Sequence, residues 1–313
     1  MIIIERYNES MRQEWNAAAE ASRNGTFLHN RAYMDYHADR FTDWSLVARS
    51  HKGRILALLP ADIKGKELRS HAGLTYGGWL MSDKADMNIM MEVWAEAREF
   101  AVRHGIDTLV YKPVPHIFHR YPAEEDLYAL FRDKANIGST QISSVIDLAQ
   151  PLPFDQNGRR GISKALKGGL SAHESRDFAS FWRILCDVLG EHHNTAPVHS
   201  LDEIEMLAGR FPENIRLFGV FEGERMVAGT VLYITHTTVH AQYIASGPSG
   251  REKGALALLF HTVIEQFKGS ARYLDFGTSN EDGGLVLNSG LIRQKCGFGA
   301  RAVAFNTYIV SWQ

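Results

Sequence analysis

The chain has 313 residues, of which 45% are hydrophobic and 22% are charged, and its formal net charge is −2. This length suits two domains of about 150 residues each, and the near-neutral charge argues against a protein that binds DNA or an anionic membrane. The two cysteines, Cys186 and Cys296, are too few for a disulfide framework. No apolar run reaches the roughly 20 residues of a membrane span. We therefore expect a cytoplasmic protein without a membrane span.

The first half of the chain predicts one α/β domain. Met1 to Arg6 predicts a first strand and not a signal peptide. The further elements expected in chain order are strands at 44–51 and 54–63, a glycine-rich passage at 73–78, a helix at 86–104, and strands at 108–111 and 141–148.

The second half predicts the same elements in the same order after a basic helix at 157–169. The expected elements are strands at 215–221, 225–235 and 240–246, a glycine-rich loop at 247–254, a helix to about 268, a strand at 273–276, a helix at 284–295 and a strand at 301–312. Two unrelated α/β domains also give a similar order. We nevertheless expect a duplication, with mixed sheets, flanking helices and a boundary near Gln150, which gives domains at 1–150 and 151–313.

The loop at 247–254 carries the clearest chemical signal. The start of a helix presents unpaired backbone N–H groups and the positive end of the helix dipole, and glycine lets a phosphate group approach the backbone. Arg251 and Lys253 add positive charge at this place. Such loops also connect strands to helices without binding a ligand, so the loop alone is a weak signal.

Arg251, Gly254 and Ala257 follow the phosphate-loop pattern of the GNAT acetyltransferases, Gln/Arg-x-x-Gly-x-Gly/Ala, with Leu256 as a departure from it. The chain thus resembles the GNAT superfamily. Over nearly its whole length it resembles the FemAB-like branch, in which two GNAT modules stand in tandem. The segments that carry this second resemblance are 159–169, 273–277 and 295–299.

The resemblance implies transfer of an acyl group to an amine. The donor is a thioester such as acetyl-CoA or, in FemAB enzymes, aminoacyl-tRNA. It also implies that the donor contacts the backbone at the end of one strand and the start of the following helix. The residues expected to bind the donor are Ile244, Ala245, Ser246, Arg251, Lys253, Gly254, Ala255 and Ala257.

Catalysis of this transfer needs a base for the amine and an acid for the leaving thiolate. Asp275 and Glu281 are the candidate bases, although carboxylates at such positions are often helix caps or solvated charges. Family enzymes often place a tyrosine on the last helix as the acid, and the helix at 284–295 has none. Tyr243 and Tyr308 are the candidate substitutes.

Four polar residues are candidates for contacts with the acceptor. Asn194 and His199 lie in a proline-bearing loop of the second half, and Lys112 and His116 follow a strand of the first half. His236 and His240 are four residues apart, but on strands they do not face one way as zinc-binding helix histidines do. We therefore expect no metal site.

These features favour an acyl-CoA-dependent N-acyltransferase with a small amine acceptor. An amino sugar of cell-surface polysaccharide synthesis is the acceptor class that the resemblance suggests, which would link the protein to the cell envelope. One alternative is a FemAB-like aminoacyltransferase that acts on a peptidoglycan precursor. Only under that alternative would the basic helix contact tRNA. A second alternative is a binding protein that has kept the fold and lost the chemistry.

Overall fold

The computed structural model describes residues 2–193 and 196–312, and the chain divides into two compact units. The N-terminal unit comprises residues 1–141 and 305–313, and the C-terminal unit comprises residues 142–304. The first crossing between the units lies upstream of the boundary expected near Gln150. The return of the chain to the N-terminal unit at Phe305 was not expected from the sequence. Two strands, β8 (Asn136–Asp147) and β16 (Arg301–Ser311), run from one unit into the other.

The N-terminal unit contains two groups of strands. One is an antiparallel sheet in the order β1-β2-β3-β6. In the other, β4 pairs with β5, β5 runs parallel to β7, and β7 pairs with the end of β16. The elements are β1 (Ile2–Arg6), α1 (Arg12–Ala21), α2 (Arg31–Met34), β2 (Leu46–Ser50), β3 (Ile55–Leu59), β4 (Asp62–Lys64), β5 (Glu67–Arg69), β6 (Leu80–Met81), α3 (Met87–Arg103), β7 (Thr108–Tyr111) and α4 (Glu125–Arg132).

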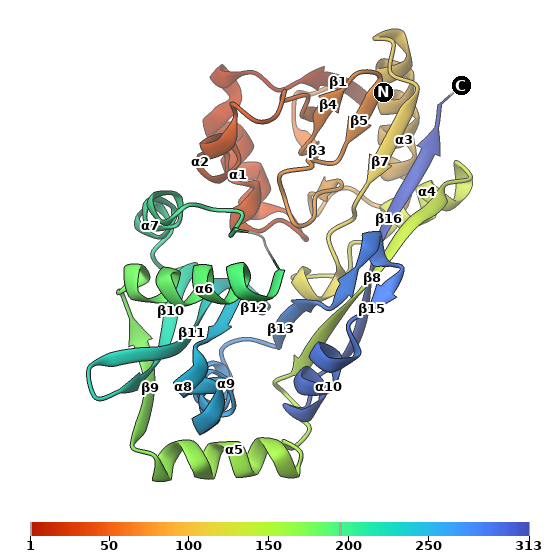
Figure 1. Cartoon of the computed structure of the whole chain (residues 1–313). Coiled ribbons are helices and arrows are strands. Elements are labelled where there is room, and N and C mark those ends of the chain that lie inside the picture. Colours follow the sequence, from red (N-terminus) through yellow and green to blue (C-terminus); the bar gives the residue numbers. More distant parts are fainter. Residues whose placement is uncertain (1, 194–195, 313) are drawn as a thin grey trace. The chain divides into compact units, whose positions relative to one another are not determined.

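The sheet of the C-terminal unit has the strand order β8-β13-β12-β11-β10-β9, and its neighbours are antiparallel except for β12 and β13. Figure 1 labels most of its helices and strands. The elements are α5 (Gln156–Lys167), β9 (Leu170–Ser175), α6 (Phe178–His193), α7 (Leu201–Arg210), β10 (Ile215–Glu222), β11 (Arg225–Ile234), β12 (Thr238–Ser246), α8 (Pro248–Lys253), α9 (Ala255–Phe267), β13 (Tyr273–Thr278), β14 (Asn280–Glu281), β15 (Val286–Leu287) and α10 (Ser289–Gly297).

Most side chains of helix α9 are apolar, because other elements of the unit cover the helix on two sides. One side packs on strands β9 to β12, and its N-terminal part packs against α5. Phe260 and Val263 are buried in the resulting core. Burial of a side chain of this size contributes about 1.5–3 kcal/mol. Helix α6 covers the other face of the sheet, where Phe181 lies against Gly229 of β11.

Apart from β4 and β5, which lie between β3 and β6 in the first unit alone, the two units repeat the same order of elements, which confirms the expected α/β fold with two tandem modules. In the first unit, the hairpin is β2 and β3, the third strand is β6, the long helix is α3 and the next strand is β7. In the second unit, the hairpin is β10 and β11, the third strand is β12, the long helix is α9 and the next strand is β13. The third strand differs: β6 has two residues and β12 has nine. The third strand of the C-terminal unit is therefore the one that is long enough to lie along an extended ligand.

Candidate active site

The sheet of the C-terminal unit opens between its two parallel strands. The pairing of β12 with β13 covers three residues and ends at His240 and Asp275, although β12 continues to Ser246 and β13 to Thr278. Beyond this point β13 pairs with β8, and β12 continues along β11. The expected divergence of the two strands is thus present, and it begins at the His240–Asp275 pair.

The segment after β12 is a short helix and not the loop that its glycines predicted. Helix α8 has Pro248 at its first position, where the fixed φ of proline suits a helix and its missing N–H costs little. Gly254 then adopts a left-handed conformation, with φ 77° and ψ 29°. This conformation ends α8, so that α9 begins afresh at Ala255. The start of α9 therefore remains the N-terminal end of a 13-residue helix.

Lys253 does not supply the charge expected beside that helix start. Its amino group forms an ion pair with Glu222 at the end of β10. Ser249 donates a second hydrogen bond to Glu222 at 3.1 Å. These hydrogen bonds lower the pKa of the Glu222 carboxyl. The prediction that Lys253 contacts the donor is therefore corrected, because its charge is directed to Glu222.

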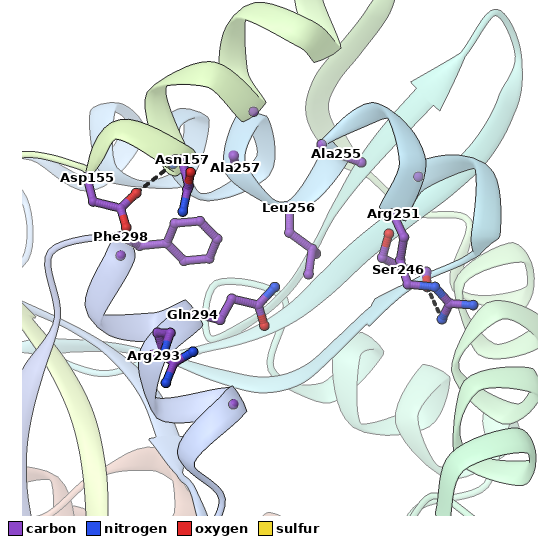
Figure 2. Close-up of a pocket in the computed structure, with 16 residues that line it drawn as sticks. Asp155, Asn157, Ser246, Arg251, Ala255, Leu256, Ala257, Arg293, Gln294 and Phe298 are labelled. Atoms are coloured by element: carbon purple, nitrogen blue, oxygen red, sulfur yellow. Dashed lines mark hydrogen bonds between the residues drawn. The ribbon is translucent and has the colours of Figure 1, made fainter.

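A cavity of about 520 Å³ lies between the starts of α5 and α9 and helix α10 (Figure 2). Leu256 and Gln294 point toward one another across it, and Arg251 and Arg293 lie on opposite sides. Two arginines together with a helix N-terminus suit an anionic ligand such as a phosphate ester. The lining residues are Asp155, Asn157, Gly158, Gly161, Ser246, Gly250, Arg251, Gly254, Ala255, Leu256, Ala257, Gly290, Arg293, Gln294, Gly297 and Phe298.

Two glycines allow α5 to lie directly against the start of α9. A Cβ atom added at Gly254 would lie 2.7 Å from the carbonyl oxygen of Gly161, and one added at Gly161 would lie 2.9 Å from the Cβ atom of Ala257. The sequence pattern assigned Gly254 to phosphate contact. The structure adds a second reason for glycine here, which is the close approach of α5.

Asp275 is buried behind the opening and orients His240. The carboxylate accepts hydrogen bonds from Ser143 Oγ and from the Gly277 N–H at 3.0 Å, and its other oxygen lies 2.8 Å from His240 Nδ1. Burial raises the pKa of Asp275, but the interactions with His240, Ser143 and Gly277 outweigh it and hold the pKa below its ordinary value. The side chain has no exposed surface. The structure therefore corrects the predicted role of Asp275 as the base, because an acceptor cannot reach it.

Sequence reasoning missed His240 as a functional residue and considered it only as a metal ligand. The pair could not be found along the chain, because 35 residues separate its members. The nearest signal was that each residue lies on a strand bordering the expected opening.

Lys295 holds α10 to the end of β13. Its buried amino group donates to the carbonyls of Gly277 at 2.9 Å and Thr278 at 3.1 Å, and to Ser279 Oγ at 2.9 Å. Burial lowers the pKa of Lys295 to about 8, and the charge of Asp275 opposes this shift. The neighbouring residue Gln294 lines the cavity, so this contact fixes one of the cavity walls.

Tyr243 and His199, predicted for different roles, lie together on the other face of the sheet. The distance between Tyr243 Oη and His199 Nδ1 is 2.5 Å, and Tyr243 packs edge-on against Trp182 of α6. Burial raises the pKa of Tyr243 to about 12, although hydrogen bonds with the backbone of His199 oppose it. A phenol with this pKa stays protonated at neutral pH. Asn194, predicted with His199, lies outside the described residues.

The remaining predicted residues of the C-terminal unit have different surroundings. Glu281 is exposed in the β14–β15 hairpin and accepts a hydrogen bond from Asn288 Nδ2 at 2.9 Å. Ile244 packs against the α9 core and Ala245 is buried. Of the strand residues predicted to border the donor, Ser246 is the one that lines the cavity.

Three predicted residues belong to the N-terminal unit and do not line this cavity. The amino group of Lys112 donates to the carbonyl of Leu74 at 3.1 Å, and burial lowers its pKa. His116 is exposed. The hydroxyl of Tyr308 accepts a hydrogen bond from the side chain of Asn306 at 3.2 Å.

Two absences concern the described part of the chain. Residues 2–193 and 196–312 contain no group of three or more His, Cys, Asp or Glu side chains placed to hold a metal ion. None of the helices within these ranges has the length and apolar character needed to cross a membrane.

Comparisons with known proteins bear on the domain and the fold. Residues 154–282 match the acetyltransferase (GNAT) domain family. The fold is similar to that of FemX, with a TM-score of 0.69 at 13% identity over 98% of this chain and 97% of that one. It is also similar to L-PGS from Bacillus licheniformis, with a TM-score of 0.62 at 13% identity over 98% and 92% of the two chains.

A tandem GNAT protein from the clavulanic acid biosynthesis pathway has a TM-score of 0.50 at 14% identity over 100% of this chain and 99% of that one. A search of curated protein sequences finds no match. Identities this low show a common fold. The domain match covers residues 154–282, and over its whole length the chain has the fold of FemX and of the tandem GNAT protein.

Proposed function

We propose that the protein is an acyl-CoA-dependent N-acyltransferase whose donor binds in the C-terminal unit. The observation that carries this proposal is the cavity at the start of α9, which adjoins the end of a strand that has diverged from its neighbour. Arg251 and Arg293 border the cavity and would neutralise the pyrophosphate of coenzyme A. Arg251 also donates to the carbonyl of Ser246 at 3.1 Å, which ties it to the strand end.

The pantetheine arm would run from the cavity along β12 toward the start of the opening. Ser246 lines the cavity, and His240 marks the point where the strands separate. Six residues of extended strand span roughly 20 Å at about 3.3 Å per residue. An extended pantetheine arm has a length of this order. The thioester would then lie where the sheet opens.

The chemistry of a thioester suits such a site. A thioester carbonyl reacts readily with an amine, so the main task of the protein is to hold the two groups in contact and exclude water. Backbone N–H groups on the strand edge at the opening would stabilise the oxyanion of the tetrahedral adduct. The acceptor in this proposal is a small primary amine, with an amino sugar of surface-polysaccharide synthesis as the first class to test.

Calorimetry with a panel of CoA thioesters tests the donor site. We expect Arg251→Ala to weaken binding about 10- to 100-fold, because a charge-assisted hydrogen bond contributes roughly 1.5–3 kcal/mol. Lys253→Ala is the matched control, since Lys253 is two residues away but pairs with Glu222. Equal affinity of the wild type and Arg251→Ala would place the phosphates elsewhere. Tight binding without transfer to any amine would indicate a binding protein.

A second candidate function, aminoacyl transfer from tRNA, is supported by helix α5. All four Lys and Arg side chains of this helix are exposed, namely Arg159, Arg160, Lys164 and Lys167. The fold is also similar to that of FemX. Filter binding with charged and uncharged tRNA separates the two functions. Binding that weakens steeply with salt and is lost when these four residues are changed to glutamate would favour tRNA as the donor. Binding of thioesters alone would exclude it.

A further inference from the structure

His240 and Asp275 form the last pair of residues before β12 and β13 diverge. His240 Nδ1 lies 2.8 Å from a carboxylate oxygen of Asp275, whose side chain has no exposed surface, whereas the side chain of His240 is 13% exposed. A carboxylate at Nδ1 favours the tautomer with its proton on Nδ1, which leaves the lone pair on Nε2. A basic nitrogen with an orienting group is therefore present where the sheet opens.

His240 lies on the face of the sheet opposite α9. Its neighbours Val239 and Ala241 belong to the core that α9 covers, and successive strand residues point to opposite faces. Tyr243, beyond a bulge in the β11–β12 pairing, packs against Trp182 of α6 on the same face as His240. The donor cavity adjoins α9. A donor from the α9 side and an acceptor from the α6 side would therefore meet at His240.

We propose that His240 is the catalytic base for the acceptor amine and that Asp275 is its positioning residue. This assignment rests on the proposed function. The amine nitrogen transfers one proton to Nε2 and forms a bond to the thioester carbon as the carbonyl π electrons move to oxygen. When the adduct collapses, the C–S bond breaks with its electron pair on sulfur. The sulfur then takes the proton from the imidazolium, so that an amide and a free thiol are formed.

The other polar groups around the opening suit this step less well. Tyr243 has a pKa of about 12 and cannot act as a base near neutral pH. The amino group of Lys295 already donates to three acceptors at the end of β13. Glu281 is in the exposed hairpin after that strand. The described charged and titratable groups near His240 include Asp275 across the opening, Lys295 on α10, which acts on Asp275, and Tyr233 and Tyr243 on the strands of its own sheet.

The experiment compares three variants in steady-state acyl transfer from the thioester that calorimetry identifies. His240→Asn keeps an N–H donor toward Asp275 but has no basic nitrogen. Asp275→Asn keeps the shape of the carboxylate and donates to His240, which moves the imidazole proton to Nε2. We expect each to lower kcat about 100-fold or more, the usual contribution of a general base. The matched control is His261→Asn, an exposed histidine on α9 outside the cavity lining.

Further readouts distinguish a base from a structural contact. In a profile of kcat against pH, the kcat of the wild type should fall as the pH is lowered, because one group takes up a proton. His240→Asn should not show this fall. Donor affinity should stay within about twofold in all three variants, because His240 does not line the donor cavity. In a fourth variant, His240→Ala, added imidazole should partly restore the activity. If Asp275→Asn fails to fold, the histidine variants alone decide the assignment.

The possible failures are separable. If His240→Asn keeps more than a third of the wild-type kcat and the same pH profile, the assignment of the base is overturned and the proposed function stands. If the wild-type protein binds and turns over neither CoA thioesters nor aminoacyl-tRNA, the proposed function and the assignment both fail.

Discussion

Replacing Gly254 with alanine adds one methyl group where α5 lies against the start of α9. The substitution has two separate costs. A left-handed φ of 77° costs a residue with a Cβ atom about 1–2 kcal/mol. The new Cβ atom would also lie 2.7 Å from the carbonyl oxygen of Gly161, which is backbone and cannot rotate away. Overpacking of this kind costs about 1–3 kcal/mol. We therefore expect a total loss of about 2–5 kcal/mol.

Gly169→Ala separates the two costs. Gly169 follows α5 in the same unit and has a similar φ of 74°, but no atom lies within 4 Å of an added Cβ atom there. We expect this control to lose only the backbone contribution of about 1–2 kcal/mol. The difference between the two variants then measures the contact between α5 and α9.

The assay is urea unfolding followed by tryptophan fluorescence, with the thioester affinity of each folded variant measured by calorimetry. Gly254→Ala should unfold at a lower urea concentration than Gly169→Ala and should bind the donor more weakly, because Gly254 lines the cavity. Equal unfolding midpoints for the two variants would refute the reasoning, since they would show that α5 does not restrict the space at Gly254.

Two further predictions concern buried charges. Burial raises the pKa of Asp126, which accepts a hydrogen bond from Tyr111, to about 7. The folded state therefore holds a proton that the unfolded state releases above about pH 4, and stability should fall by roughly 2–3 kcal/mol between pH 5 and pH 8. Asp126→Asn should remove this part of the fall in urea unfolding at the two pH values, and an unchanged difference would contradict the assignment. Lys295→Met should cost about 2–4 kcal/mol, because it removes the donor of the hydrogen bonds to the partly buried carbonyls of Gly277 and Thr278 and to Ser279 Oγ. It should also weaken thioester binding, and an unaltered urea midpoint would argue against the contact.

Local patterns were sufficient to predict the long elements of the fold. Helix α3 was expected at 86–104 and spans Met87–Arg103. Asp86 caps its start by accepting a hydrogen bond from the Ile89 N–H, and Val93 and Trp94 lie on its buried face. Each of these signals is contained within the helix itself, so sequence spacing alone reveals it.

Shorter elements near the site were harder to predict. The helix expected at 284–295 begins at Ser289, because Gly283 and Gly284 have positive φ angles and the preceding residues form the β14–β15 hairpin. Helix α8 was predicted as a loop because it contains glycine and proline. Pro248 in fact stands at the position where a helix accepts proline most easily.

The part of the candidate site that comes from one continuous segment of the sequence was predictable. Arg251, Gly254, Ala255 and Ala257 line the cavity as expected of a strand–helix junction. Arg293 joins them from α10, and no spacing in the sequence pointed to it. The pairing of His240 with Asp275 depends on the register of two parallel strands, and the pairing of Lys253 with Glu222 depends on a neighbouring strand. Such contacts arise only once the chain has folded.

The return of the chain to the N-terminal unit affects the order in which the protein can fold during synthesis. Residues 305–313 complete the N-terminal unit, where Tyr308 pairs with Tyr111 and the indole N–H of Trp312 donates to Asp133 at 2.9 Å. All residues of the C-terminal unit precede this segment. On the ribosome the unit whose synthesis begins first is therefore the last to receive all its strands. Until then β7 presents an unpaired edge, which is a site for misassembly that a chaperone or rapid closure must protect.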